Sequence, residues 1–185
     1  MEFTLGPEEQ RLLLATARCA IYDRLGLRFD VPAPFASEAL AATCGAFVTL
    51  HKGGRLRGCI GHLSSDRPLT ETVSEVAVSS AFDDPRFPPV TEEEAPRLSI
   101  EISVLSPFRE ISDPREVVVG THGILMRRGG RSGLLLPQVA TEQGWDREEF
   151  LDHTCLKAGL PMGSWRESGT HIEVFSAFVF GEDNK

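Results

Sequence analysis

A cysteine lies between two glycines, close to an arginine and a histidine, in the segment LRGCIG at residues 56–61. A thiol becomes a nucleophile when a positive neighbour, a helix N-terminus or a base lowers its pKa. Arg57 precedes Cys59 by two residues, His62 follows it by three, and a helix predicted to begin near Pro68 would add positive potential. The same pattern is typical of a small buried cysteine where larger side chains do not fit. Both interpretations of Cys59 are open.

The two glycines of this segment, Gly58 and Gly61, are unusual inside a strand because glycine has no side chain to pack. Glycine also lets another group come close to the backbone. That group is either a substrate or a packing neighbour. We therefore include both glycines among the candidate substrate-binding residues.

Two further residues have the chemistry of proton carriers. Glu101 is the one charged residue in the alternating segment SIEISVL, where it points away from the apolar face. It is either a base in a cleft or a residue on a solvated face. His122 lies between glycines in GTHG and is either a proton carrier or a passive turn residue. The candidate catalytic set is therefore Cys59, Glu101 and His122.

Polar residues in two other segments are candidates for substrate binding. Asp84 and Arg86, in DDPRF, would hold a planar anion through the arginine fork or form a local ion pair. Gln138, in LLLPQVA, shares a helix face with Glu142, four residues later. The full candidate binding set is Arg57, Gly58, Gly61, His62, Asp84, Arg86 and Gln138.

A metal site is not predicted. Cys59 and His62 offer two ligands, but structural zinc sites show two paired ligand sets and no H-E-x-x-H helix is present. A third and more restricted hypothesis is that the protein carries a metal or a cofactor. The sequence does not identify that cofactor.

Periodicity predicts the elements that must position these residues. Helices are predicted over 7–25, 66–82 and 145–160, with Asp66 as a cap of the second and Asp146 with Glu149 as a capping box of the third. Glycine pairs predict hairpins over 45–61 and 122–140, and alternation predicts strands over 97–106 and 171–180. Because the strands come mostly as hairpins, we predict an α+β fold with a mostly antiparallel sheet.

Composition narrows the class of protein. The chain has 185 residues, 41% hydrophobic and 25% charged, and we expect a single domain spanning 1–185. A net charge of −8 argues against nucleic acid and against an anionic membrane as partners. No signal peptide or bilayer-spanning run is visible. Four dispersed cysteines favour reduced thiols, so we expect a cytoplasmic protein.

The segments LRGCIG, DPRF, EISVLSP, GTHGILM, GLLLPQVA and KAGLP resemble, in this order, the AMMECR domain, called AmmeMemoRadiSam system protein A in prokaryotes. The resemblance covers nearly the whole chain. It implies a two-lobe α/β unit in which a sheet, flanking helices and a smaller lobe surround a groove. It also implies Memo-type and radical-SAM-like proteins as partners, and it makes Leu56 to Gly61 the motif that identifies the domain.

Two classes of function fit these observations. The first is a thiol-dependent or acid–base enzyme, or an accessory subunit of one, acting on a small polar molecule or a protein. Cys59 would be its nucleophile, Arg57 would bind an anion, and Glu101, His62 or His122 would move the proton. The second is a non-catalytic adaptor that docks a Memo-type or radical-SAM-like partner through a groove lined by the RGCIG and LLPQVA segments.

Overall fold

The structure, a computed structural model, describes residues 4–182. The chain divides into two compact units. Of the described residues, 4–105 and 178–182 form the first unit, and 106–177 form the second. The last strand, β7 (His171–Gly181), begins in the second unit and ends in the first.

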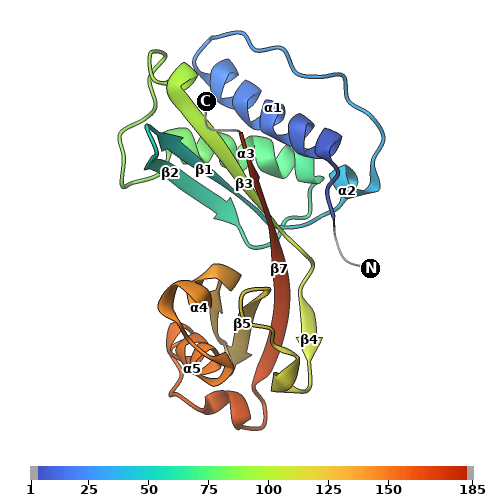
Figure 1. Ribbon diagram of the computed structural model, residues 1–185, viewed down its shortest axis with the longest axis vertical. Coiled ribbons are helices and arrows are strands. Elements are labelled where there is room, and N and C mark those ends of the chain that lie inside the picture. The colour runs from blue at the N-terminus through green and yellow to red at the C-terminus, as the bar shows by residue number, and fades with distance from the viewer. Residues whose placement is uncertain (1–3, 183–185) are drawn as a thin grey trace. The chain divides into compact units, whose positions relative to one another are not determined.

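The first unit is built on an antiparallel sheet (Figure 1). The predicted hairpin is confirmed: β1 (Ala46–Lys52) and β2 (Arg55–His62) are joined by a Gly-Gly turn in which both glycines have positive φ. β3 (Leu98–Leu105) pairs with the other edge of β1, and the end of β7 follows β3. β2 is therefore an edge strand of this sheet.

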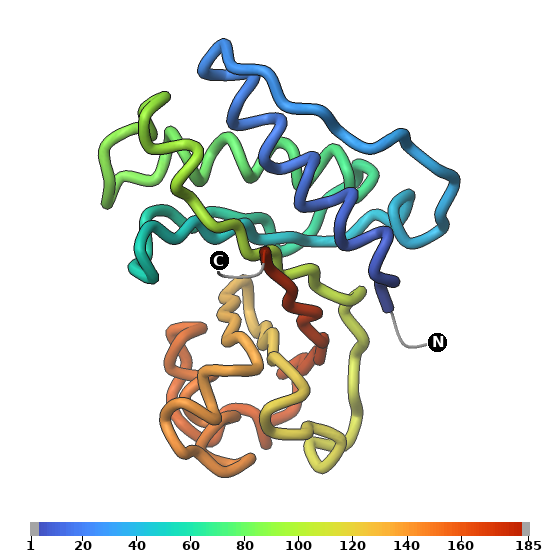
Figure 2. The backbone as a smooth tube through the Cα atoms, turned by 45° about the horizontal axis from the view of Figure 1, so that its top comes forward, coloured from blue at the N-terminus to red at the C-terminus, as the bar shows by residue number. Residues whose placement is uncertain are grey.

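Two helices, α1 (Pro7–Arg24) and α3 (Leu69–Phe82), cover one face of this sheet (Figure 2). The strands alternate in register, so one set of apolar side chains points to these helices and is buried. This set is Ala46, Val48, Leu50, Leu98, Ile100, Ile102 and Val104. The short helices α2 (Glu38–Ala41) and η1 (Ala95–Arg97) complete the unit. The predicted cap Asp66 is wrong, because Pro68 precedes the first helical residue of α3.

The second unit has its own antiparallel strands and its own core (Figure 1). Its strands are β4 (Arg109–Ile111), β5 (His122–Arg128), β6 (Arg131–Leu135) and the first part of β7. Its helices are α4 (Pro137–Gln143), α5 (Arg147–Lys157) and the short η2 (Pro114–Glu116) and η3 (Ser164–Arg166).

The capping box of α5 is confirmed, since Asp146 and Glu149 each accept the other's backbone N–H at 2.9 Å. The protein is α+β with antiparallel strands and flanking helices, as the sequence predicts. No helix formed by residues 4–182 has both the length and the apolarity needed to cross a bilayer.

Candidate functional site

Two candidate side chains of the first unit, Cys59 and Glu101, form a row with Thr49 across the sheet face opposite α1 and α3. Thr49 of β1 pairs with Cys59 of β2 on one side and with Glu101 of β3 on the other. At the next strand, a Cβ placed on Gly181 would lie 3.6 Å from the Cβ of Glu101. We call Cys59, Thr49, Glu101 and Gly181 the thiol–carboxylate row. The side chains of Cys59, Thr49 and Glu101 are all partly exposed.

The hydroxyl of Thr49 contacts the thiol directly. Its Oγ1 donates a hydrogen bond to Sγ of Cys59 at 3.3 Å. The backbone N–H and C=O of Cys59 bond to groups beyond the free edge of β2, so Thr49 and Cys59 form a non-hydrogen-bonded pair, the type whose side chains approach most closely. The strand register therefore places a hydrogen-bond donor beside the sulfur.

An ion pair with a buried carboxylate clamps the backbone of Cys59 at the edge of the sheet. The N–H of Cys59 donates to Oδ2 of Asp84 at 2.9 Å, and Nη2 of Arg86 donates to the carbonyl of Cys59 at 3.3 Å. Arg86 also donates to both oxygens of Asp84, at 2.9 and 2.7 Å. The Asp84 side chain is 2% exposed, and the Arg86 guanidinium holds the pKa of this carboxyl well below its usual range. Asp84 and Arg86 thus fix the position of the Cys59 backbone.

Cys59 lies near the C-terminal end of α3, whereas the helix dipole stabilises a thiolate only at the N-terminal end. Asp84, which binds the N–H of Cys59, directly follows the C-terminal cap of the helix, Asp83. A helix of 14 residues is about 20 Å long, so its N-terminus is far from the thiol. The expectation that the N-terminus of α3 faces Cys59 is therefore wrong, and the helix dipole does not favour a thiolate here.

The two glycines of the motif are explained by packing. A Cβ on Gly58 would lie 2.1 Å from the carbonyl oxygen of Ser80 in α3, so the absence of a side chain lets the helix approach the strand. A Cβ on Gly61 would lie 2.4 Å from the ring of Phe47, which occupies the space above it on the outer face. A substrate-binding role for either glycine stays a prediction.

Arg57 is held by the segment that follows α3. Its Nη2 donates to Oε2 of Glu94 at 3.0 Å, and Nζ of Lys52 donates to the other oxygen of Glu94 at 2.6 Å. These two hydrogen bonds lower the pKa of Glu94 to about 2. Nη1 of Arg57 is buried and has no hydrogen-bond partner among residues 4–182. Arg57 therefore anchors residues 83–97 to β2, and its role in binding an anion stays a prediction.

His62 points to the helix side of the sheet. It pairs with Ala46, a buried residue of the inner face, and its Nε2 lies 3.5 Å from Oε1 of Glu75 in α3. Cys59 is three residues away on an extended strand, so the two side chains project from opposite faces. The sequence spacing brings these residues close along the chain without bringing the imidazole to the sulfur.

His122 and Gln138 belong to the second unit. Nδ1 of His122 accepts the N–H of Val118 at 3.2 Å, which leaves Nε2 to carry the proton of the neutral ring. Burial and the nearby Arg109 lower the pKa of His122. Gln138 is an exposed residue in the first turn of α4. Their catalytic and binding roles stay predictions.

Sequence reasoning missed two residues that shape the site. Thr49 carries the donor to the thiol, and Ser80 accepts the N–H of Ile60 while donating to the carbonyl of Val48, each at 2.8 Å. The hydroxyl of Ser80 thereby links α3 to both strands of the hairpin. Alternation in FVTLH places Thr49 on a polar face, but only the strand register identifies Cys59 as its partner.

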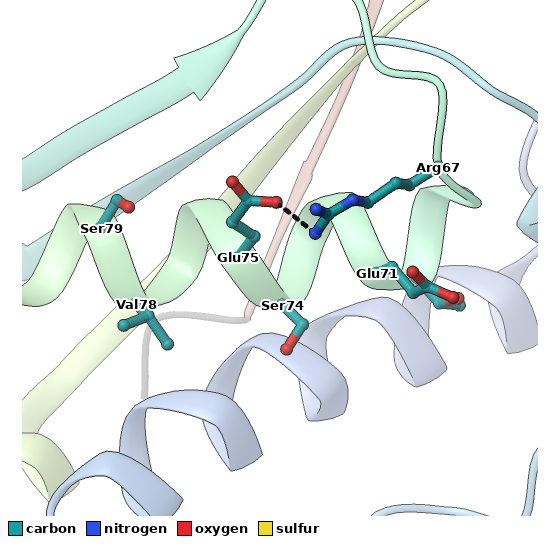
Figure 3. A pocket seen from close by; sticks show the side chains of 7 residues that line it. Arg67, Glu71, Ser74, Glu75, Val78 and Ser79 are labelled. Carbon is teal, nitrogen blue, oxygen red and sulfur yellow. Dashed lines mark hydrogen bonds and ion pairs between the residues drawn. The ribbon is translucent and has the colours of Figure 1, made fainter.

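Neither a metal-ligand cluster nor the hollow along α3 is a stronger candidate. Residues 4–182 contain no group of three or more His, Cys, Asp or Glu side chains arranged to hold a metal ion. A hollow of about 540 Å³ follows the exposed face of α3 (Figure 3). Its cation, Arg67, already pairs with Glu75 at 3.1 Å. The thiol–carboxylate row therefore stays the best candidate.

Comparison with known proteins gives a consistent family match. The AMMECR1 family model matches residues 14–180. Protein MK0488 of Methanopyrus kandleri is 46% identical over 187 aligned residues, which cover 95% of this chain and 89% of that protein. A protein of Methanothermobacter thermautotrophicus is 44% identical, with 97% of each chain covered. The crystal structure of Uncharacterized Protein PH0010 from Pyrococcus horikoshii is similar with a TM-score of 0.79 at 41% identity, covering 97% of this chain and 94% of that one.

Proposed function

The chain belongs to the AMMECR1 family, and from this premise we propose that it is a thiol-dependent enzyme, or the accessory subunit of one, acting at the thiol–carboxylate row. Cys59 is the nucleophile and Thr49 donates a hydrogen bond to its sulfur. Glu101 contacts the other end of the bound molecule. Arg57, in the same unit, stays a candidate for binding an anionic group of the substrate.

The observation that carries this proposal is the clamp on Cys59. Asp84 is an almost fully buried carboxylate, and burying a charge costs free energy unless it is paired and hydrogen-bonded. Here the buried charge bonds the backbone N–H of Cys59, whose side chain is left partly exposed. Rigid support beneath an accessible reactive group is what a catalytic residue requires.

The distance between the strands supports different roles for Glu101 and Cys59. Neighbouring strands are about 5 Å apart, so Cys59 and Glu101, with β1 between them, are separated by about 10 Å. A general base must lie within about 3 Å of the proton that it removes. Glu101 therefore acts on the substrate and does not deprotonate the thiol of Cys59.

We expect Cys59 to be the cysteine alkylated fastest in the folded protein. In a short pulse of iodoacetamide at pH 7.5, it should react at least threefold faster than the partly exposed Cys19, whose pKa is raised by burial and by Asp23. Thr49→Val should slow Cys59 about threefold, because the sulfur loses its hydrogen-bond donor. Peptide mass spectrometry measures the label at each cysteine.

The other thiols are internal controls. Cys44 and Cys155 are buried, and burial raises the pKa of Cys44 to about 11. Both should stay unlabelled until the protein is unfolded. Equal rates for Cys59 and Cys19, unchanged by Thr49→Val, would contradict the thiol-dependent function.

A second candidate function is a non-catalytic adaptor, for which two exposed apolar residues provide support. Leu56 and Leu63, at either end of β2, are 42% and 41% exposed. If a Memo-type or radical-SAM-like partner docks there, Leu56→Glu with Leu63→Glu should reduce its capture in a pull-down at least tenfold. Cys59→Ala should leave capture unchanged. Capture that survives the leucine substitutions would contradict docking at this surface.

A further inference from the structure

We infer that the substrate of the thiol–carboxylate row carries an alkylammonium or guanidinium group that binds beside Glu101. The inference rests on the proposed function, since it assigns the chemistry of the molecule on which Cys59 acts. It concerns residues of the first unit alone.

A pocket adjoins Glu101 at the end of the row. Its volume is about 180 Å³, enough for a small charged group and a few carbons. Its lining includes His51, Ser99, Glu101, Gly181 and Glu182. His51, Ser99 and Glu101 occupy strand positions of the same alternating set as Thr49, so they lie on the same sheet face as the thiol of Cys59.

Among residues 4–182, the carboxylate of Glu101 in this pocket has no ion-pair partner. Glu182 is neutralised, because Nε of Arg18 donates to it at 2.9 Å and the N–H of Ile100 donates at 2.9 Å. The backbone of Glu101 pairs with Thr49 in the sheet, but its carboxylate has no hydrogen bond or ion pair with any other side chain between residues 4 and 182. No lysine or arginine is among the residues that line the pocket, and its imidazole, His51, forms no ion pair with Glu101. A cation is the group that this carboxylate lacks.

Gly181 keeps the space beside the carboxylate open. A Cβ there would lie 3.3 Å from the carbonyl oxygen of Ile100 and 3.6 Å from the Cβ of Glu101. Any longer side chain at this position would therefore stand next to the Glu101 carboxylate. Substitution of Gly181 is a way to block the pocket without touching Glu101.

The distance between Cys59 and Glu101 sets the length of a substrate that can reach both residues. The thiol and the carboxylate rise from strands about 10 Å apart, with Thr49 between them. A molecule that places an electrophilic atom at Cys59 and a cation at Glu101 must span this distance. An aliphatic chain of about six atoms has the required length.

Charge-selective labelling of Cys59 tests the inference. The probes are 6-aminohexyl methanethiosulfonate, neutral hexyl methanethiosulfonate and the shorter 2-aminoethyl reagent. In each reaction the thiolate attacks the sulfenyl sulfur, a disulfide forms and methanesulfinate leaves. Rates at Cys59 are measured at low ionic strength by peptide mass spectrometry, and each is divided by the rate of the same reagent with 2-mercaptoethanol.

The aminohexyl reagent should react with Cys59 faster than the hexyl reagent. Glu101→Gln should reduce the ratio of these two rates about threefold, which is the effect expected of one charge pair that is partly exposed to solvent. Gly181→Leu should reduce it similarly by filling the pocket. Glu71→Gln, on the exposed face of α3, should leave it unchanged. The aminoethyl reagent, which is too short to reach Glu101, should show a smaller dependence on Glu101.

The possible failures are distinguishable. If Cys59 reacts readily but Glu101→Gln leaves the aminohexyl-to-hexyl ratio unchanged, the cationic substrate is excluded and the thiol-dependent function stands. If none of the reagents modifies Cys59 in the folded protein, the proposed function fails and this inference fails with it.

Discussion

Gly58→Ala is expected to lower the free energy of unfolding by about 3 kcal/mol or more, the upper range for overpacking a core. The added Cβ would lie 2.1 Å from the carbonyl oxygen of Ser80. That oxygen is part of the α3 backbone, so the helix as a whole must move away from β2. Urea denaturation followed by circular dichroism measures the change.

A matched substitution separates this contact from the general effect of alanine in a strand. Gly181→Ala adds a Cβ whose nearest neighbour is 3.3 Å away, at the end of β7 in the same sheet. It should cost less than about 1 kcal/mol. Equal losses for Gly58→Ala and Gly181→Ala would show that the approach of α3 does not explain Gly58. If Gly58→Ala fails to fold in buffer alone, the wild type, Gly58→Ala and Gly181→Ala are compared in a stabilising osmolyte.

Asp84→Ala is expected to lower the free energy of unfolding by about 2–3 kcal/mol. The substitution leaves the N–H of Cys59 unpaired and removes the partner of Arg86. Arg86 is 54% exposed and can be solvated, which keeps the loss below that of a fully buried pair. The neighbouring Asp83→Ala is the control, since Asp83 is exposed and should change stability by less than about 0.5 kcal/mol.

The Asp84 contribution should also depend on pH. The pKa of Asp84 in the folded protein is held below the value of about 3.9 expected in the unfolded chain. Its contribution is therefore complete above about pH 5 and is lost as the pH falls towards the folded-state pKa. The difference in unfolding free energy between the wild type and Asp84→Asn should shrink between pH 5 and pH 3. A difference that is constant over this range would contradict the ion-pair account.

The helices, strands and turns of this fold could be predicted from the sequence because each depends on a local pattern of residues. The capping box of Asp146 and Glu149, the turn at Gly53 and Gly54, and the alternation of 98–105 all depend on residues close in the chain. Periodicity also assigned Glu101 to the polar side of its strand correctly. The resemblance to the AMMECR domain, given by the order of several short segments, is confirmed by the family match.

The residues that contact Cys59 could not be predicted from local sequence patterns. Sequence distance suggested Arg57 and His62, but Arg57 binds Glu94 and His62 lies on the opposite face with Glu75. The residues that do contact Cys59 are Thr49, Asp84 and Arg86, between 10 and 27 residues away. A bulge near Leu50 and His51 shifts the register of the hairpin, and no local pattern in the sequence indicates it.

The sequence by itself determined the α+β class, the helices and hairpins, and the family, because these follow from hydrophobic periodicity and from residues near one another in the chain. Only the tertiary structure decided what surrounds the thiol. The pairing of β1 with both β2 and β3 brings Cys59, Thr49 and Glu101 into one row, and the approach of α3 accounts for Gly58. Such contacts depend on strand register and helix packing, which are set by the folding of distant segments together.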